Sequence, residues 1–107
     1  MQSKEYIEKA MRTCIHDDAG DMIREAAAGI ASEAGEVLSL IRKWEFQGHP
    51  LLPDQIIDEM GDVFWFMAEM AAALDITFEE ICQRNLAKTL DRYPHGFDPF
   101  LSLNRAK

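Results

Sequence analysis

Several sequence features are scarce in this 107-residue chain, and each scarcity excludes a class of protein. Only two cysteines occur, Cys14 and Cys82, and neither belongs to a Cys-x-x-Cys or Cys/His cluster, so we expect ordinary reduced thiols in a cytoplasmic protein. The longest apolar run, Val63 to Ala68, falls well short of the ~20 residues that a membrane span requires. The N-terminus is charged throughout and therefore does not resemble a secretory signal.

Positive charge is also scarce. Eleven Lys and Arg residues face nineteen Asp and Glu residues, which gives a net charge of −8. Such a field repels a nucleic-acid backbone, so we expect no nucleic-acid partner. One small phosphorylated ligand remains compatible with this charge if a metal ion screens it. The length and the ordinary mixture of 48% hydrophobic and 28% charged residues predict one soluble globular domain over residues 1–107.

No segment alternates with a period of two, so the sequence requires no β-strand. Apolar residues instead recur with helical spacing, which predicts an all-α fold. We expect four helices, over residues 3–16, 21–46, 53–74 and from 77 to the residues before Pro94. They form a four-helix protomer with a core over 21–93, and an irregular tail over 94–107 that contains two prolines and a glycine.

Capping residues set the predicted helix ends. Ser3 and Asp21 are the expected N-caps of the first two helices, and Gly48 is the expected residue just beyond the second. The third helix begins near Pro53, and a capping box that starts at Thr77 opens the fourth.

The third helix is apolar on both sides. One side carries a stripe that includes Met60 and Met67, and the other side carries Trp65. A helix of this kind is normally buried on both sides, and one small protomer cannot easily cover it. We therefore predict a protomer completed by oligomerisation, as a homodimer or homotetramer. The alternative is that the C-terminal tail folds back over Trp65.

Two acidic pairs carry most of the functional information. Glu33 and Glu36 are spaced i, i+3 in the second helix, and Glu59 and Asp62 have the same spacing in the third. Residues three apart lie on one helical face, so each pair places two like charges side by side at the margin of an apolar stripe. Those charges cost free energy unless a cation neutralises them. Four carboxylates on facing helices suit a hard divalent ion such as Mg²⁺, with Mn²⁺ as a substitute.

A polar row on the fourth helix complements the acids. Asn85, Lys88 and Arg92 fall on one stripe of that helix. Phosphate recognition uses both a metal that bridges phosphate oxygens and Lys or Arg side chains that hold the remaining ones. The alternative is that Lys88 and Arg92 only interact with the dipole at the C-terminal end of their helix.

The chain resembles a known family at these motifs. Ser32-Glu-Ala-Gly-Glu36, followed by Glu59-Met-Gly-Asp62, is similar to the ExxE and ExxD signature of MazG-type nucleotide pyrophosphohydrolases, in the all-α NTP pyrophosphatase superfamily. Further similar stretches run from Phe46 to Pro50 and from Asn85 to Pro94, so the resemblance covers roughly residues 21–97.

The resemblance implies an activity and a role for each residue of the motifs. The activity is Mg²⁺-dependent hydrolysis of a nucleoside triphosphate to the monophosphate and pyrophosphate, in an oligomer that pairs helices from two chains. The metal ligands implied are Glu33, Glu36, Glu59 and Asp62, and the phosphate contacts implied are Asn85, Lys88 and Arg92. On chemical grounds we assign the activation of the attacking water to Glu33 or Glu36, because a carboxylate not fully engaged by metal can accept its proton.

Other functions remain open on the sequence alone. One is a non-catalytic helical oligomerisation module whose acids are surface features. A second is a metal–carboxylate bundle for redox or storage, although the Glu-x-x-His signature of di-iron bundles is absent. Within the family, a dUTPase or a phosphoribosyl-ATP pyrophosphohydrolase is a further alternative, because no residue pattern selects the base or the sugar.

Overall fold

The computed structural model describes residues 1–105 and confirms an all-α fold, with no β-strand among those residues. Residues 106–107 of the predicted tail lie outside the described part. The elements are α1 (Ser3–Ala10), the 3₁₀ turn η1 (Met11–Thr13), α2 (Ala19–Gln47), α3 (Pro53–Leu74), α4 (Phe78–Arg92) and α5 (Pro99–Leu103). Among these elements, no helix combines the length and hydropathy needed to cross a membrane.

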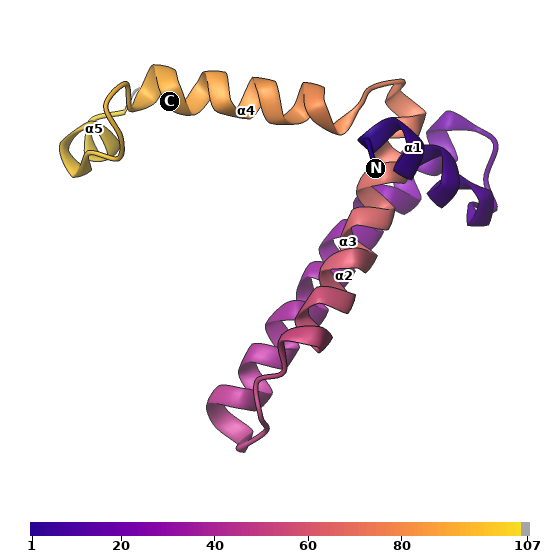
Figure 1. The fold of residues 1–107 in the computed structure, drawn as a ribbon, viewed down its shortest axis with the longest axis horizontal. Helices are drawn as coiled ribbons and strands as arrows, with labels where there is room; N and C mark the ends of the chain where they lie inside the picture. Colours follow the sequence, from indigo (N-terminus) through magenta and orange to yellow (C-terminus); the bar gives the residue numbers. More distant parts are fainter. Residues whose placement is uncertain (106–107) are drawn as a thin grey trace.

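The long helices α2 and α3 form an antiparallel hairpin (Figure 1). Gly48 ends α2 in the left-handed conformation (φ 70°), as the sequence predicted, and the N–H of the next residue, His49, donates to the carbonyl of Lys43 at 3.1 Å. Pro53 occupies the first turn of α3, where the missing N–H has no intrahelical partner to lose. The predicted bounds of the third helix are confirmed.

The first predicted helix is shorter than expected. The sequence indicated one helix over 3–16, but α1 ends at Ala10 and the chain is extended by Cys14 (ψ 133°). The physical reason lies in Thr13 and Trp65. The Thr13 hydroxyl donates to the Ala10 carbonyl at 3.0 Å, and the Trp65 indole N–H donates to the same carbonyl at 3.1 Å. The Ala10 carbonyl therefore has hydrogen-bond donors even though the helix does not continue past it.

Two predicted N-caps were wrong, and one was right. Asp18, not Asp21, caps α2, because its carboxylate accepts from the Asp21 N–H at 3.0 Å. Ser3 lies inside α1, and its hydroxyl accepts from the Phe78 N–H at 3.2 Å, so it satisfies the start of α4 instead. Thr77 caps α4 as predicted, accepting from the N–H of Glu80.

The C-terminal tail is more ordered than predicted. Asp98 caps the short helix α5 by accepting from the N–H groups of Phe100 and Leu101, at 2.8 and 3.4 Å. An Asp-Pro pair opening a helix is a recognisable signal that the irregular-tail prediction missed. This helix lies beyond the far end of α4, away from the hairpin (Figure 1). The alternative that the tail covers Trp65 was therefore wrong.

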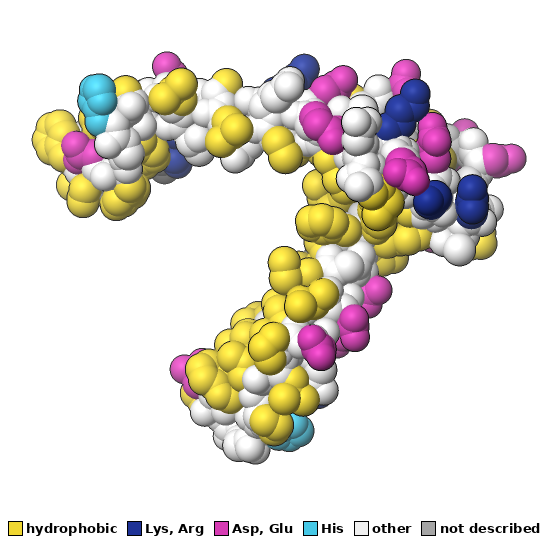
Figure 2. Space-filling model, viewed as in Figure 1, with side chains coloured by type: hydrophobic (Ala, Val, Ile, Leu, Met, Phe, Trp, Pro, Cys, Tyr) yellow, Lys and Arg dark blue, Asp and Glu magenta, His cyan; other side chains and the backbone are white. Residues whose placement is uncertain are grey.

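The two sides of α3 differ in how far the rest of the chain covers them. The Trp65 side is covered within the chain, since the indole N–H also donates to the Thr13 hydroxyl at 3.0 Å. Ile7 of α1 packs there against Ala68 and Ala71 in the small buried core. The opposite stripe stays open: Met60 is 49% exposed and Phe64 is 52% exposed. Figure 2 shows hydrophobic side chains spread along the hairpin and along α4.

The single chain is not compact. After α3 the chain turns, and α4 projects away from the hairpin (Figure 1). The radius of gyration is 17.1 Å, against about 13 Å for a compact domain of this length. The accessible surface is 8177 Å², about 2,000 Å² more than a folded monomer of this mass exposes on average. Both quantities describe a protomer with large faces that its own chain leaves uncovered.

Candidate active site

The antiparallel hairpin brings the two acidic pairs together. Glu33 on α2 faces Glu59 and Asp62 on α3, and each of the three offers a carboxylate oxygen within 4.8 Å of the others. Two of these acids are half-buried and Asp62 is exposed. Glu36 does not belong to this triplet, and its side chain is exposed. The structure thus gathers three of the four predicted metal ligands and leaves the fourth beside them.

The charges of the triplet repel one another. Burial raises the pKa of Glu59, and the neighbouring carboxylates of Asp62, Glu33 and Glu36 raise it further, in that order. The ion pairs found within residues 1–105 join Lys9 to Glu5, His16 to Glu25 and Arg24 to Asp21. None of them neutralises the four acids, so the site carries uncompensated negative charge.

Such a site fits a hard divalent cation. Oxygen ligands on Mg²⁺ lie about 2.0–2.1 Å from the ion, so two of them can be at most about 4.2 Å apart. Carboxylates that already converge within 4.8 Å need only small rotations to reach that range. The donor set of carboxylate oxygens, without sulfur or imidazole, is the one that Mg²⁺ prefers over softer metals.

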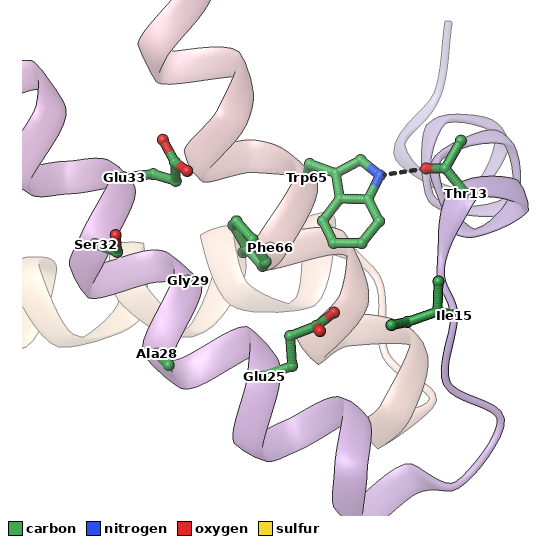
Figure 3. Close-up of a pocket in the computed structure, with 9 residues that line it drawn as sticks. All are labelled: Thr13, Ile15, Glu25, Ala28, Gly29, Ser32, Glu33, Trp65 and Phe66. Atoms are coloured by element: carbon green, nitrogen blue, oxygen red, sulfur yellow. Dashed lines mark hydrogen bonds between the residues drawn. The ribbon is translucent and has the colours of Figure 1, made fainter.

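An open cavity of about 490 Å³ reaches the triplet at Glu33, which is one of its lining residues (Figure 3). It is lined on one side by α2, from Glu25 through Gly29 to Glu33, and on the other by the rings of Trp65 and Phe66. The two rings meet edge to face, with their centroids 5.0 Å apart. The volume lies within the range of small-molecule pockets, about 300–1,000 Å³. Carboxylates suited to a metal ion lie at one end of the cavity, and aromatic rings form the wall beside them. Such a site fits a ligand that is both charged and flat.

Gly29 shapes this cavity. A Cβ atom added at Gly29 would lie 2.2 Å from Cδ1 of Phe66, closer than any real contact. The missing side chain therefore lets the Phe66 ring lie directly on the backbone of α2. The sequence analysis did not identify this role of Gly29.

The polar row on α4 lies apart from the acids in a single chain. Asn85, Lys88 and Arg92 are exposed on α4, which contacts α1 and projects away from the α2–α3 hairpin (Figure 1). Arg92 occupies the last turn of α4, where interaction with the helix dipole is strongest. Lys88 lies one turn earlier, so the dipole explains it less well.

The structure also reveals a hydrogen-bonded group that the sequence reasoning missed. It links Cys14, His16, Glu25 and Glu69 beneath the cavity. The Cys14 thiol donates to Glu69 Oε2 at 3.2 Å, and His16 Nε2 lies 2.9 Å from Glu25 Oε2. A single acid within the otherwise apolar stretch from Val63 to Leu74 was the available signal, because a buried acid requires a partner.

Comparison with known protein families decides the classification. The model of the MazG nucleotide pyrophosphohydrolase domain matches residues 22–97. The chain belongs to the MazG family. The match includes the four acids and the polar row of α4, and it leaves out α1 and most of the C-terminal tail.

The chain is also similar to a bacteriophage protein. The Gene 37 protein of Mycobacterium phage L5 is 30% identical over 96 residues, which cover 81% of this chain and 84% of the phage protein. No solved structure matches the chain. Family membership connects this MazG domain with hydrolysis of nucleotides.

Proposed function

We propose that the protein is a Mg²⁺-dependent nucleoside triphosphate pyrophosphohydrolase, which cleaves an NTP or dNTP to the monophosphate and pyrophosphate and so cleans the nucleotide pool. The observation that carries this proposal is the convergence of Glu33, Glu59 and Asp62 at the edge of a cavity with two aromatic walls. The cavity accepts a flat base, and the acids lie where the phosphates of the same ligand would follow. Such a substrate is a cytoplasmic metabolite, and we propose that the protein acts in that compartment.

The proposed roles follow from position. Glu33, Glu59 and Asp62 hold Mg²⁺, with Mn²⁺ as a substitute. When bound, the ion offsets the charge of the phosphates and stabilises the leaving pyrophosphate. Glu36 lies outside the triplet, so its carboxylate is free to orient the attacking water and accept its proton. Of the two candidates for the general base, Glu33 and Glu36, we therefore choose Glu36.

We also propose that the working form is a homodimer or homotetramer. The chain exposes about 2,000 Å² more than an average monomer of its mass. A standard interface covers about 800 Å² on each partner, and permanent interfaces cover more. The open stripe of α3 around Met60 and Phe64 and the apolar residues of α4 supply such faces. A second chain packed there would bury the apolar surface that α1 leaves uncovered.

Oligomerisation would also place the polar row. Within one chain, α4 projects away from the α2–α3 hairpin that carries the acids (Figure 1). We propose that Asn85, Lys88 and Arg92 contact the phosphates bound at the acids of a neighbouring chain. Lys and Arg hold phosphate oxygens by charge-assisted hydrogen bonds, which complement a metal that bridges the others.

The test is release of pyrophosphate from a panel of nucleoside triphosphates, with and without Mg²⁺. Glu36→Gln and Glu59→Gln should abolish turnover while the helical content is retained. Glu45→Gln is the matched control. Glu45 is exposed on α2 and lies nine residues from Glu36, which places it on the opposite face of the helix. Full activity in both site variants would refute the proposal, and absence of any nucleotide hydrolysis would favour the oligomerisation module.

A further inference from the structure

Glu69 is a carboxyl group in an unusual position. Its side chain has no exposed surface, and its Oε1 is buried without a hydrogen-bond partner among residues 1–105. Its other oxygen, Oε2, accepts from the Cys14 thiol at 3.2 Å. A carboxyl group that is buried with so few donors is less costly in its neutral form than in its charged form.

Glu69 and Glu25 lie in different environments. Burial raises the pKa of Glu69 above its usual range, whereas the neighbouring Glu69 and His16 side chains lower the pKa of Glu25. The two acids therefore differ: the interior favours the neutral form of Glu69, and the contact with His16 favours the charged form of Glu25, nearer the surface. Cys14 and His16 hold the two ends of the pair, at 3.2 Å from Glu69 and 2.9 Å from Glu25.

Glu25 is the member of the pair that reaches the cavity. It lines the cavity, and its side chain remains 32% exposed. Figure 3 shows its carboxylate directed toward the space beside Trp65 and Phe66. Glu25 and Glu33 are eight residues apart on α2, which separates them by about 12 Å along the helix axis. A nucleoside with its first phosphates can bridge that distance, with the base beside the aromatic rings.

We propose, on the basis of the proposed nucleotide hydrolysis, that Glu25 contacts the base of the substrate and selects bases that carry an amino group at position 4 of a pyrimidine or position 6 of a purine. A carboxylate accepts hydrogen bonds only, so it matches the amino group of cytosine or adenine. Uracil and thymine carry a keto oxygen at position 4 instead. That oxygen would face the negative charge of Glu25, and the carboxylate would lose the hydrogen bond that an amino group donates. The contact between His16 Nε2 and Glu25 Oε2, at 2.9 Å, holds the carboxylate in place, which makes the preference a property of the folded site.

The sharpest test compares dCTP with dUTP, which differ at ring position 4 by an amino group against a keto oxygen. For the wild type, kcat/KM for dCTP should exceed that for dUTP by about tenfold to a hundredfold, the range expected for a hydrogen bond to a charged group. Glu25→Gln should remove most of this preference by lowering kcat/KM for dCTP while leaving dUTP essentially unchanged. Glu45→Gln on the same helix is the control and should keep the wild-type ratio.

Binding of the non-hydrolysable α,β-imido analogues of the two nucleotides, measured by calorimetry, separates selection from turnover. The wild type should bind the cytosine analogue more tightly by the same factor. If the wild type bound the two analogues equally, or bound the uracil analogue more tightly, the role of Glu25 would be overturned. This result does not depend on whether Glu25→Gln folds. A parallel loss for both nucleotides in Glu25→Gln would show that Glu25 only anchors the segment around His16. Equal hydrolysis of dCTP and dUTP overturns this inference alone, whereas failure to bind or hydrolyse either overturns it together with the proposed function.

Discussion

Substitution of Gly29 by alanine tests the packing that shapes the cavity. The added Cβ atom would lie 2.2 to 2.4 Å from three ring atoms of Phe66, so the ring must move. Forcing extra volume into a packed position costs about 1–3 kcal/mol, and alanine returns about 0.8–1.0 kcal/mol over glycine in a helix. We therefore expect a net loss of about 1 kcal/mol, or a fall in Tm of about 4–8 °C.

Gly35→Ala is the matched control in the same helix. Nothing lies within 4 Å of a Cβ atom at Gly35, so this variant keeps the gain in helix propensity without the steric cost. Thermal melts of the two variants at one protein concentration isolate the steric cost, because the propensity gain cancels in their difference. If Gly29→Ala raised Tm as much as Gly35→Ala, the close packing of Phe66 on α2 would be refuted. A shift of the Phe66 ring should also weaken binding of nucleotide analogues in Gly29→Ala.

Three further predictions concern the phosphate row, the assembly and the acids. Lys88→Ala should lower kcat/KM by about tenfold or more if Lys88 contacts phosphate, as steady-state kinetics would show, whereas a role limited to the helix dipole would cost only about 0.3–1 kcal/mol of stability in a thermal melt. Light scattering at micromolar concentration should give a mass well above the 12.2 kDa of one chain, and a monodisperse monomer would contradict the proposed assembly. The raised pKa of Glu59 means that its contribution to stability is full below its ordinary value of 4.5 and is lost as the pH rises through the raised value. The Tm of the metal-free wild type should therefore fall relative to that of Glu59→Gln over that pH window. Added Mg²⁺ should reverse the difference at pH 7. Parallel curves of Tm against pH for the two proteins would argue against repulsion in the triplet.

Local sequence signals determined the helices and the acids. The apolar period predicted a helix from near Pro53 to near Leu74, and α3 has these bounds, because proline is favoured in the first turn of a helix and Leu74 ends the apolar pattern. Gly48 and Thr77 were identified for the same reason: left-handed backbone and capping hydroxyls are properties of one residue and its near neighbours. The i, i+3 spacing of the acids, combined with two helices joined by a short turn, predicted that all four acids would meet, and the structure brings together Glu33, Glu59 and Asp62 but not Glu36.

Contacts between distant segments decided the rest. Ser3 caps a helix 75 residues away instead of its own, and the indole of Trp65 bonds the carbonyl at which α1 ends. Glu69 meets the thiol of Cys14, 55 residues away, only because the folded chain brings the two side chains together. Such partners cannot be read from spacing along the chain, since a hydrogen bond is set by distance in space. The direction of α4 is likewise a tertiary property, and it separates the helix that carries Lys88 from the acids of its own chain, although both lie within residues 22–97, which match the family model.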